Sequence, residues 1–132
     1  MITKSLRIDH LSDAEHRTCL ACLAALDARD VDAYGEHPAA GVSMRLGNAD
    51  PVAGRDAAKE MLAGCWQSLA GIEHDLVNVY GTDRAHALEA DSHDLRHDGG
   101  RVTVRAVPFT DEDKAGHVAS PRSYGNTPAV AA

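Results

Sequence analysis

The stretch of sequence that decides the fold runs over residues 72–109 and reads IEHDLVNVYGTDRAHALEADSHDLRHDGGRVTVRAVPF. Apolar and polar residues alternate along much of it, which is the period of a β-strand with one buried face. Turn-forming residues interrupt the alternation at residues 81–83 and 98–100. Together with the chain that follows, the pattern predicts strands over residues 72–80, 84–96, 101–109 and 117–126.

Upstream of this stretch, apolar residues recur at helical spacing. Ser12 followed by Glu15 is a capping-box pattern, and apolar positions on one helical face come after it. We therefore expect a first helix over residues 12–28. A second, short helix is expected to begin after Asp30, which can cap it, and to end before Pro38.

A short strand and a long helix complete the first half of the chain. Val42, Met44 and Leu46 alternate with polar residues, as in a half-buried strand. An apolar stripe of helical period begins after Gly54, and Gly71 is a plausible end for this longest helix. Three helices followed by a run of antiparallel strands indicate the α+β class, with the helices packed on one face of a curved antiparallel sheet.

The composition restricts the kind of protein. We expect one domain over residues 1–132, with a loose tail over residues 127–132. The formal net charge of -7 would repel phosphates, so no nucleic-acid partner is expected. The first eleven residues lack the apolar run of a signal peptide and no later stretch could span a bilayer, so no membrane association is expected. Three cysteines, an odd number, offer no disulfide framework and favour a cytoplasmic location.

Four short motifs, taken in order, carry a resemblance to a known family. They are LDARDVDA at 26–33, VAGRDAA at 52–58, IEHD at 72–75 and RSYGNTP at 122–128. Their order and spacing resemble the SnoaL-like branch of the nuclear transport factor 2-like superfamily, which includes ketosteroid isomerases, limonene epoxide hydrolases and polyketide cyclases. The resemblance implies a cone-shaped sheet around a deep apolar pocket that three N-terminal helices close, and a homodimer formed through the outer face of the sheet. It fixes no reaction, because this fold hosts enzymes and binding modules alike.

The residues that perform the family's known reactions are replaced in this chain. The resemblance places Arg45 at the catalytic base of ketosteroid isomerases, and Cys22 and Arg105 at the two groups that hold their oxyanion. A guanidinium cannot abstract a proton at ordinary pH, so ketosteroid isomerase activity by that mechanism is not expected. The central Arg and the following Asp of the epoxide hydrolases correspond to Ala90 and Ser92, so that chemistry is not expected either.

Asp91 and His93 are the candidate catalytic residues. They share one face of the strand predicted over residues 84–96, where Asp91 could tune His93 as an acid or base. If the opposite, apolar face lines the pocket instead, both residues are solvated sheet surface. Alternation favours this second interpretation, because it usually buries the apolar residues.

Arg45 and Arg105 are candidates for ligand binding. In the family's register both point into the cavity and form a cationic clamp for a carboxylate or a similar anion. The same register places Val102, Val104 and Ala106 on the outer face, where they would form the dimer interface. Alternation alone favours the reverse arrangement, with the valines inside and Arg105 in solvent.

Tyr34 and Trp66 are further candidates for ligand binding. They lie on the short and the long predicted helices, where the resemblance directs large side chains at the cavity. Each could equally be an ordinary core residue. His74 stands at one of the family's landmarks, and a hydrogen-bonded structural role is the favoured interpretation.

No metal or other cofactor is expected. Cys19 and Cys22 fall in the middle of the first predicted helix, where core packing explains them better than a redox or zinc site. Cys65 does not supply the second pair of ligands that a structural zinc site needs.

The functional hypothesis is therefore broad. We expect a protein that binds a small, largely apolar organic molecule and that catalyses metal-free proton transfer, dehydration or hydrolysis on it. The alternative is a non-catalytic ligand-binding or dimerisation module. Whether the chain is an enzyme depends on the lining of the cavity: Asp91 and His93 inside favour an enzyme, and an all-apolar lining favours binding.

Overall fold

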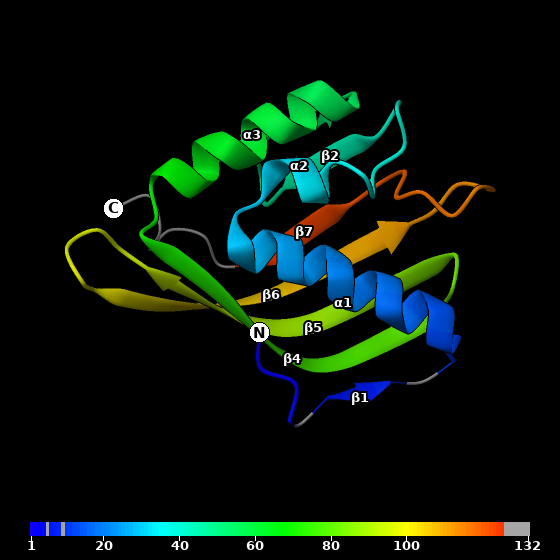
Figure 1. The fold of residues 1–132 in the computed structure, drawn as a ribbon, viewed down its shortest axis with the longest axis horizontal. Coiled ribbons are helices and arrows are strands. Elements are labelled where there is room, and N and C mark those ends of the chain that lie inside the picture. The colour runs from blue at the N-terminus through cyan, green and yellow to red at the C-terminus, as the bar shows by residue number, and fades with distance from the viewer. Residues whose placement is uncertain (5, 9, 126–132) are drawn as a thin grey trace.

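The computed structural model describes residues 1–4, 6–8 and 10–125 (Figure 1). The tail expected over residues 127–132 and the end of the last predicted strand lie outside the described residues. The described helices are α1 (Asp13–Ala28), α2 (Val31–Tyr34) and α3 (Arg55–Gln67). The described strands are β1 (Arg7–Ile8), β2 (Ser43–Leu46), β3 (Val52–Ala53), β4 (Gly71–Thr82), β5 (Ala85–Leu95), β6 (Arg101–Asp111) and β7 (Arg122–Gly125).

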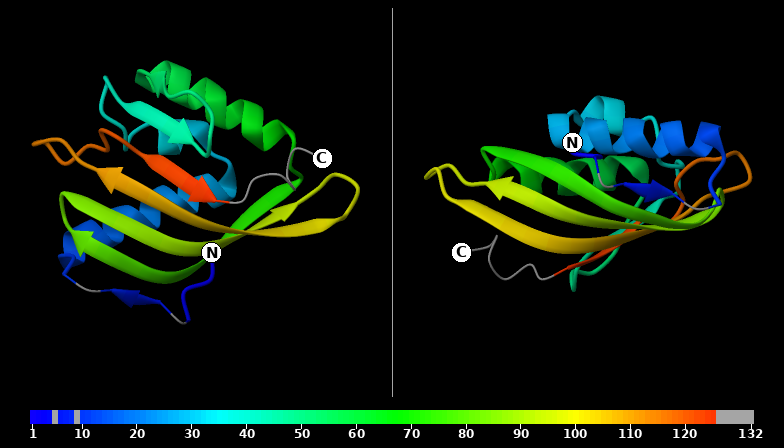
Figure 2. Two further views of the ribbon diagram at one scale, coloured as in Figure 1. Left: turned by 180° about the vertical axis from the view of Figure 1, so that it is seen from behind. Right: turned by 90° about the horizontal axis from the view of Figure 1, so that it is seen from below.

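The strands form one curved sheet, and the helices lie on its concave face (Figures 1 and 2). The strand order is β1-β4-β5-β6-β7-β2-β3, in which β4 to β7 are antiparallel neighbours. β2 joins β7 in parallel and so brings the first half of the chain to the far end of the sheet. This is the predicted α+β architecture, a cone with helices over its mouth.

Local signals account for the helix ends. The Ser12 hydroxyl accepts a hydrogen bond from the Glu15 backbone N–H at 3.1 Å, as the capping pattern predicts. Asp30 caps α2 by accepting from the N–H groups of Asp32 and Ala33. The helices predicted after Ser12 and Asp30 are thus confirmed, and α1 ends where Arg29 adopts a left-handed conformation.

Some strands differ from the prediction. The last one is short, Arg122–Gly125, because residues 117–121 make only isolated bridges, such as that between Pro38 and Val118. The two-residue strands β1 and β3 were not predicted, since two residues carry no periodicity. A bulge at Val77 shifts the register of β4, so that Leu76 and Val79 both belong to the buried core.

Two apolar clusters hold the helices to the sheet. One joins α2, α3 and β2 and includes Tyr34, Met44 and Trp66. The other joins α1 to β4 and β5 and includes Leu23 and Leu76. Among the described residues, no helix is long and apolar enough to cross a membrane.

Candidate functional site

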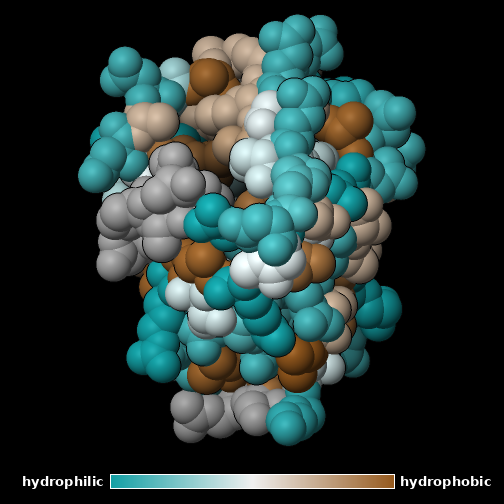
Figure 3. All heavy atoms as spheres, turned by 90° about the vertical axis from the view of Figure 1, so that its left-hand side faces the viewer, coloured by the Kyte–Doolittle hydropathy of each residue, from teal (hydrophilic) through white to brown (hydrophobic). Residues whose placement is uncertain are grey.

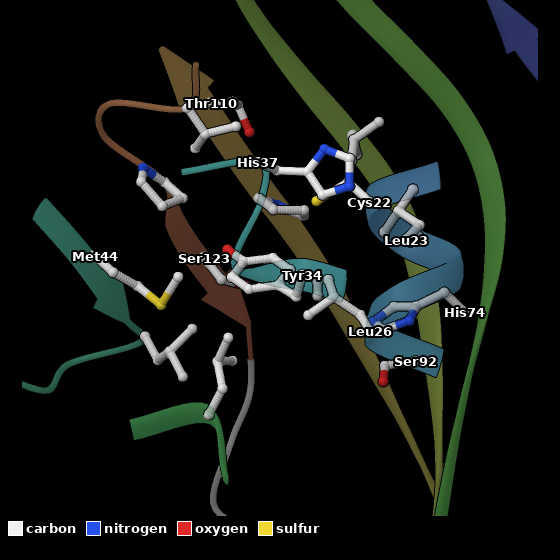
Figure 4. A pocket seen from close by; sticks show the side chains of 18 of the residues that line it. Cys22, Leu23, Leu26, Tyr34, His37, Met44, His74, Ser92, Thr110 and Ser123 are labelled. Carbon is white, nitrogen blue, oxygen red and sulfur yellow. The ribbon is translucent and has the colours of Figure 1, made fainter. Parts of the chain in front are cut away.

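A cavity of about 660 Å³ lies between the concave face of the sheet and the helices. This volume is in the range that small-molecule sites occupy, about 300 to 1,000 Å³. Apolar side chains from the helices and the sheet dominate its lining (Figure 4), among them Leu23, Leu26, Met44, Trp66, Leu88 and Val104. The cavity wall is therefore largely apolar.

Three of the predicted ligand-binding residues line this cavity. Tyr34 and Trp66 are buried in its wall, and Tyr34 extends into it (Figure 4). Arg45 borders the cavity and is itself exposed. Burial raises the pKa of the Tyr34 phenol, which keeps the hydroxyl protonated and available as a hydrogen-bond donor.

The predicted arginine clamp does not form. The Arg105 side chain is 90 % exposed, and its Nε lies 3.3 Å from Oδ1 of Asp91. Val104 and Ala106, its neighbours on β6, line the cavity instead. The family register that placed Arg105 inside is wrong for this strand, because alternation buries the apolar residues and sends the guanidinium to water.

Asp91 and His93 also lie outside the cavity. On β5 the residues that line the cavity are His86, Leu88, Ala90, Ser92 and Asp94. Alternation turns the two candidates to the opposite face, where the His93 ring hydrogen-bonds the hydroxyl of Thr103 at 3.0 Å. The prediction that Asp91 and His93 face the cavity is therefore wrong. The face of β5 that carries Leu88 and Ala90 is the inner one.

His74 lines the cavity wall (Figure 4), as do His37, His86 and His117, and it is the one that a half-buried carboxylate holds in place. It lies on β4, paired with Ser92 of β5. Its Nδ1 is 2.5 Å from Oδ1 of Asp27, and its backbone N–H donates to Oδ2 of the same carboxylate at 3.2 Å. Because Asp27 occupies Nδ1, the other ring nitrogen, Nε2, is left for a ligand.

The Asp27 carboxylate is suited to orient this imidazole. Burial by itself would raise its pKa, but the hydrogen bonds and charge of His74 outweigh burial and hold the pKa of Asp27 below its usual value. The amino group of Met1 lies 3.1 Å from the same carboxylate and adds to the effect. An ionised Asp27 fixes the tautomer of the ring and stabilises the imidazolium that forms when the ring takes a proton.

Polar groups gather at two ends of the cavity. Beside His74, the Ser92 hydroxyl donates to the buried Asp94 carboxylate at 2.8 Å. The other end of β5 carries His86, whose Nε2 lies 3.2 Å from Sγ of Cys19 on α1. Six residues of extended strand separate Ser92 from His86, a distance of about 20 Å, so these are two separate polar sites.

Sequence reasoning missed most of these groups. The sequence predicts Glu15 only as part of a helix cap and Cys19 only as a core residue, and no pattern in it indicates a site at His86. Glu112 carries no sequence signal, yet burial and a hydrogen bond that its protonated carboxyl donates to Glu15 raise its pKa to about 8. Only His74 had been singled out, because its IEHD motif marks a landmark of the resembled family.

Comparisons with known proteins give structural neighbours only. No protein-family model and no curated protein sequence matches this chain. A structure described as a SnoaL-like polyketide cyclase from Jannaschia sp. CCS1 is similar with a TM-score of 0.77 at 19 % identity, covering 89 % of this chain and 88 % of that one.

Two further neighbours are described with a ligand or an activity. TerC, co-crystallised with polyporic acid, has a TM-score of 0.76 at 16 % identity, over 87 % of this chain and 93 % of its own. An LEH-like epoxide hydrolase from M. tuberculosis has a TM-score of 0.72 at 18 % identity, covering 85 % of this chain and 82 % of its own. Identities this low establish the fold and leave the activity open. This chain thus has the fold of the SnoaL-like and nuclear transport factor 2-like proteins.

Proposed function

We propose that the protein binds a small, largely apolar organic molecule in the cavity, and that His74, oriented by Asp27, transfers a proton to or from it. The observation that carries this proposal is the hydrogen-bonded His74–Asp27 pair, set into the wall of a largely apolar cavity. Imidazole changes charge between about pH 5 and 8, which suits a general acid or base at neutral pH.

The surrounding groups fit such a role. Nε2 of His74 would take the proton while Asp27 stabilises the charged ring, with no metal needed at this end of the cavity. The protonated hydroxyl of Tyr34 can donate a hydrogen bond to an oxygen of the ligand. Exclusion of water by the apolar lining strengthens both interactions. Among proteins of the same fold, TerC holds an organic acid, polyporic acid, which supports a ligand of this general kind.

A generic proton-abstraction probe tests the proposal without knowledge of the substrate. 5-Nitrobenzisoxazole opens to a coloured phenolate when a base removes its ring C–H proton, so the rate can be followed by absorbance. We expect His74→Gln to lower the protein-catalysed rate by roughly 100- to 10,000-fold, the usual contribution of a general base. His93→Gln is the matched control, because it removes a histidine from the opposite face of the sheet.

The alternative function, a non-catalytic binding module, makes a different prediction. It is favoured by the dominance of apolar residues in the lining. In that case the probe reacts equally slowly with the unaltered protein, His74→Gln and His93→Gln, while an apolar fluorophore such as 1-anilinonaphthalene-8-sulfonate still binds. That combination would overturn the proton-transfer role and leave binding as the function.

We also propose a homodimer formed through the outer face of the sheet. Large apolar side chains are exposed on this face at other positions than those expected from sequence. They are Tyr80, Leu95, Val107, Phe109 and Tyr124. Phe109 and Tyr124 pack edge to face with ring centroids 5.8 Å apart. Polar side chains dominate the end of the molecule beside the β5–β6 turn (Figure 3), which makes that end a poorer interface.

Light scattering tests the dimer. A stable, isologous interface should bury at least roughly 1,000 Å² in total. Phe109→Glu should convert a dimer to a monomer, whereas Leu95→Glu, an equally exposed change farther along the same face, should have a smaller effect. A monomeric unaltered protein would refute this assembly.

A cytoplasmic location remains part of the proposal. Its support is chemical: Cys19, Cys22 and Cys65 are all free thiols, as is usual in a reducing compartment.

A further inference from the structure

Three different metal-ligating side chains converge at the end of the cavity opposite His74. Glu15 and Cys19 lie one turn apart on α1, and His86 faces them from the start of β5. Sγ of Cys19 is 3.2 Å from Nε2 of His86 and 3.7 Å from Oε1 of Glu15. The three ligand atoms all lie within 4.8 Å of one another.

We propose that Glu15, Cys19 and His86 form a binding site for a divalent transition-metal ion of the zinc type. Zinc bonds of about 2.3 Å to sulfur and about 2.0 Å to nitrogen or oxygen, arranged tetrahedrally, place neighbouring ligand atoms about 3.5 Å apart. The two measured distances lie on either side of that value. Small side-chain movements would therefore complete the geometry.

The position of the site leaves room for a fourth ligand. All three residues line the cavity, so the open coordination position would face it. Three protein ligands with one open position are typical of zinc sites that bind water or substrate, rather than of closed structural sites. The site stands apart from the proton transfer proposed for His74, because His74 on β4 contacts Asp27, which lies about 12 Å farther along α1 than Cys19.

The local charge favours a cation. The charged side chains that act on Cys19 and His86 are acidic, namely Glu15, Asp83, Asp111 and Glu112. Glu112 hydrogen-bonds Glu15, and burial with this second carboxylate raises the pKa of Glu112 to about 8. Through this hydrogen bond Glu112 would support Glu15 as a ligand.

The ligand types also suit a metal of this kind. Cys19 would bind as a thiolate and His86 as a neutral imidazole. On binding, the metal–sulfur bond forms as the thiol proton is released to solvent, so that the charge balances.

Cobalt(II) is the direct probe, because a thiolate ligand gives an absorption band that a surface histidine cannot give. Cobalt chloride is titrated into untagged, full-length protein that is kept reduced with a phosphine. We expect a thiolate-to-cobalt band that saturates at one ion per chain and that zinc chloride abolishes by competition. Cys19→Ala and His86→Gln should each remove the band, and Glu112→Gln should weaken affinity by roughly 10- to 100-fold.

Cys22→Ala is the matched control, since this thiol is on the same helix and lines the same cavity outside the ligand cluster. It should keep the band, as should His74→Gln, so that a failure of the proton-transfer proposal leaves this test intact. Circular dichroism verifies folding of each variant, and His86→Gln stands in if Cys19→Ala does not fold. Absence of the band in the unaltered protein, or its persistence in a folded Cys19→Ala or a folded His86→Gln variant, would overturn the site.

Discussion

Replacing Leu23 by alanine should destabilise the protein strongly, because this side chain joins α1 to the sheet. Leu23 is only 4 % exposed and belongs to the cluster that contains Leu76, Val79 and Leu88. Truncation of a buried leucine removes its transfer free energy and leaves a void, and costs about 2 to 5 kcal/mol. We expect the lower half of this range, since Leu23 already faces the cavity on one side and loses fewer packing contacts than a fully enclosed leucine.

Urea denaturation followed by circular dichroism measures this effect. At a slope of about 1 to 3 kcal/mol per molar urea, a loss of 2 kcal/mol moves the midpoint by about 1 M. Leu95→Ala is the control, because Leu95 is 42 % exposed, and its removal should change the free energy of unfolding by less than about 1 kcal/mol. Equal losses for the two variants would refute the assignment of the inner face of the sheet.

Three further predictions concern ionisation and the backbone. The pKa of Asp27 is lowered in the folded state, so its contribution to stability is present above pH 3.8 and is lost as the pH falls through the folded pKa. Asp27→Asn should therefore show a smaller loss of stability in acid than the unaltered protein. The pKa of Glu112 is raised from 4.5 to about 8, so its contribution to stability is present below pH 4.5 and is lost as the pH rises to about 8. Denaturation of Glu112→Gln over this pH range should show a smaller loss of unfolding free energy than the unaltered protein. Gly81→Ala should lower the melting temperature, because Gly81 has a φ of 121° and an added Cβ would collide with the Ala85 carbonyl. Gly99→Ala should have the smaller effect, because a Cβ added at Gly99 has no neighbouring atom within 4 Å.

The order of elements was predictable because it rests on local signals. Ser12 and Asp30 each supply a side-chain cap within three residues of its partner, so the two helix starts follow from short-range chemistry. Alternation likewise predicted the three long strands, since the side-chain period of an extended chain is local. The family resemblance added the cone, which the structure confirms at the level of fold.

The sequence allowed two predictions of which strand face points into the cavity. The family register placed Arg105 inside, and simple alternation placed Val104 inside; Val104 is buried and Arg105 exposed. The cost of burying a guanidinium without a partner explains the outcome. Asp91 and His93 could act in the cavity only if the polar strand face pointed inward, and the cost of burying charged groups disfavours that arrangement.

The sequence by itself determined the class of fold and the alternation that makes one strand face apolar, because both depend on residues close together in the chain. The two polar sites were decided by tertiary structure alone. Asp27 and His74 are 47 residues apart, and Cys19 and His86 are 67 residues apart. Each pair meets only because α1 packs across β4 and β5, and the placement of a helix on a sheet depends on the fit of the whole core rather than on any local pattern.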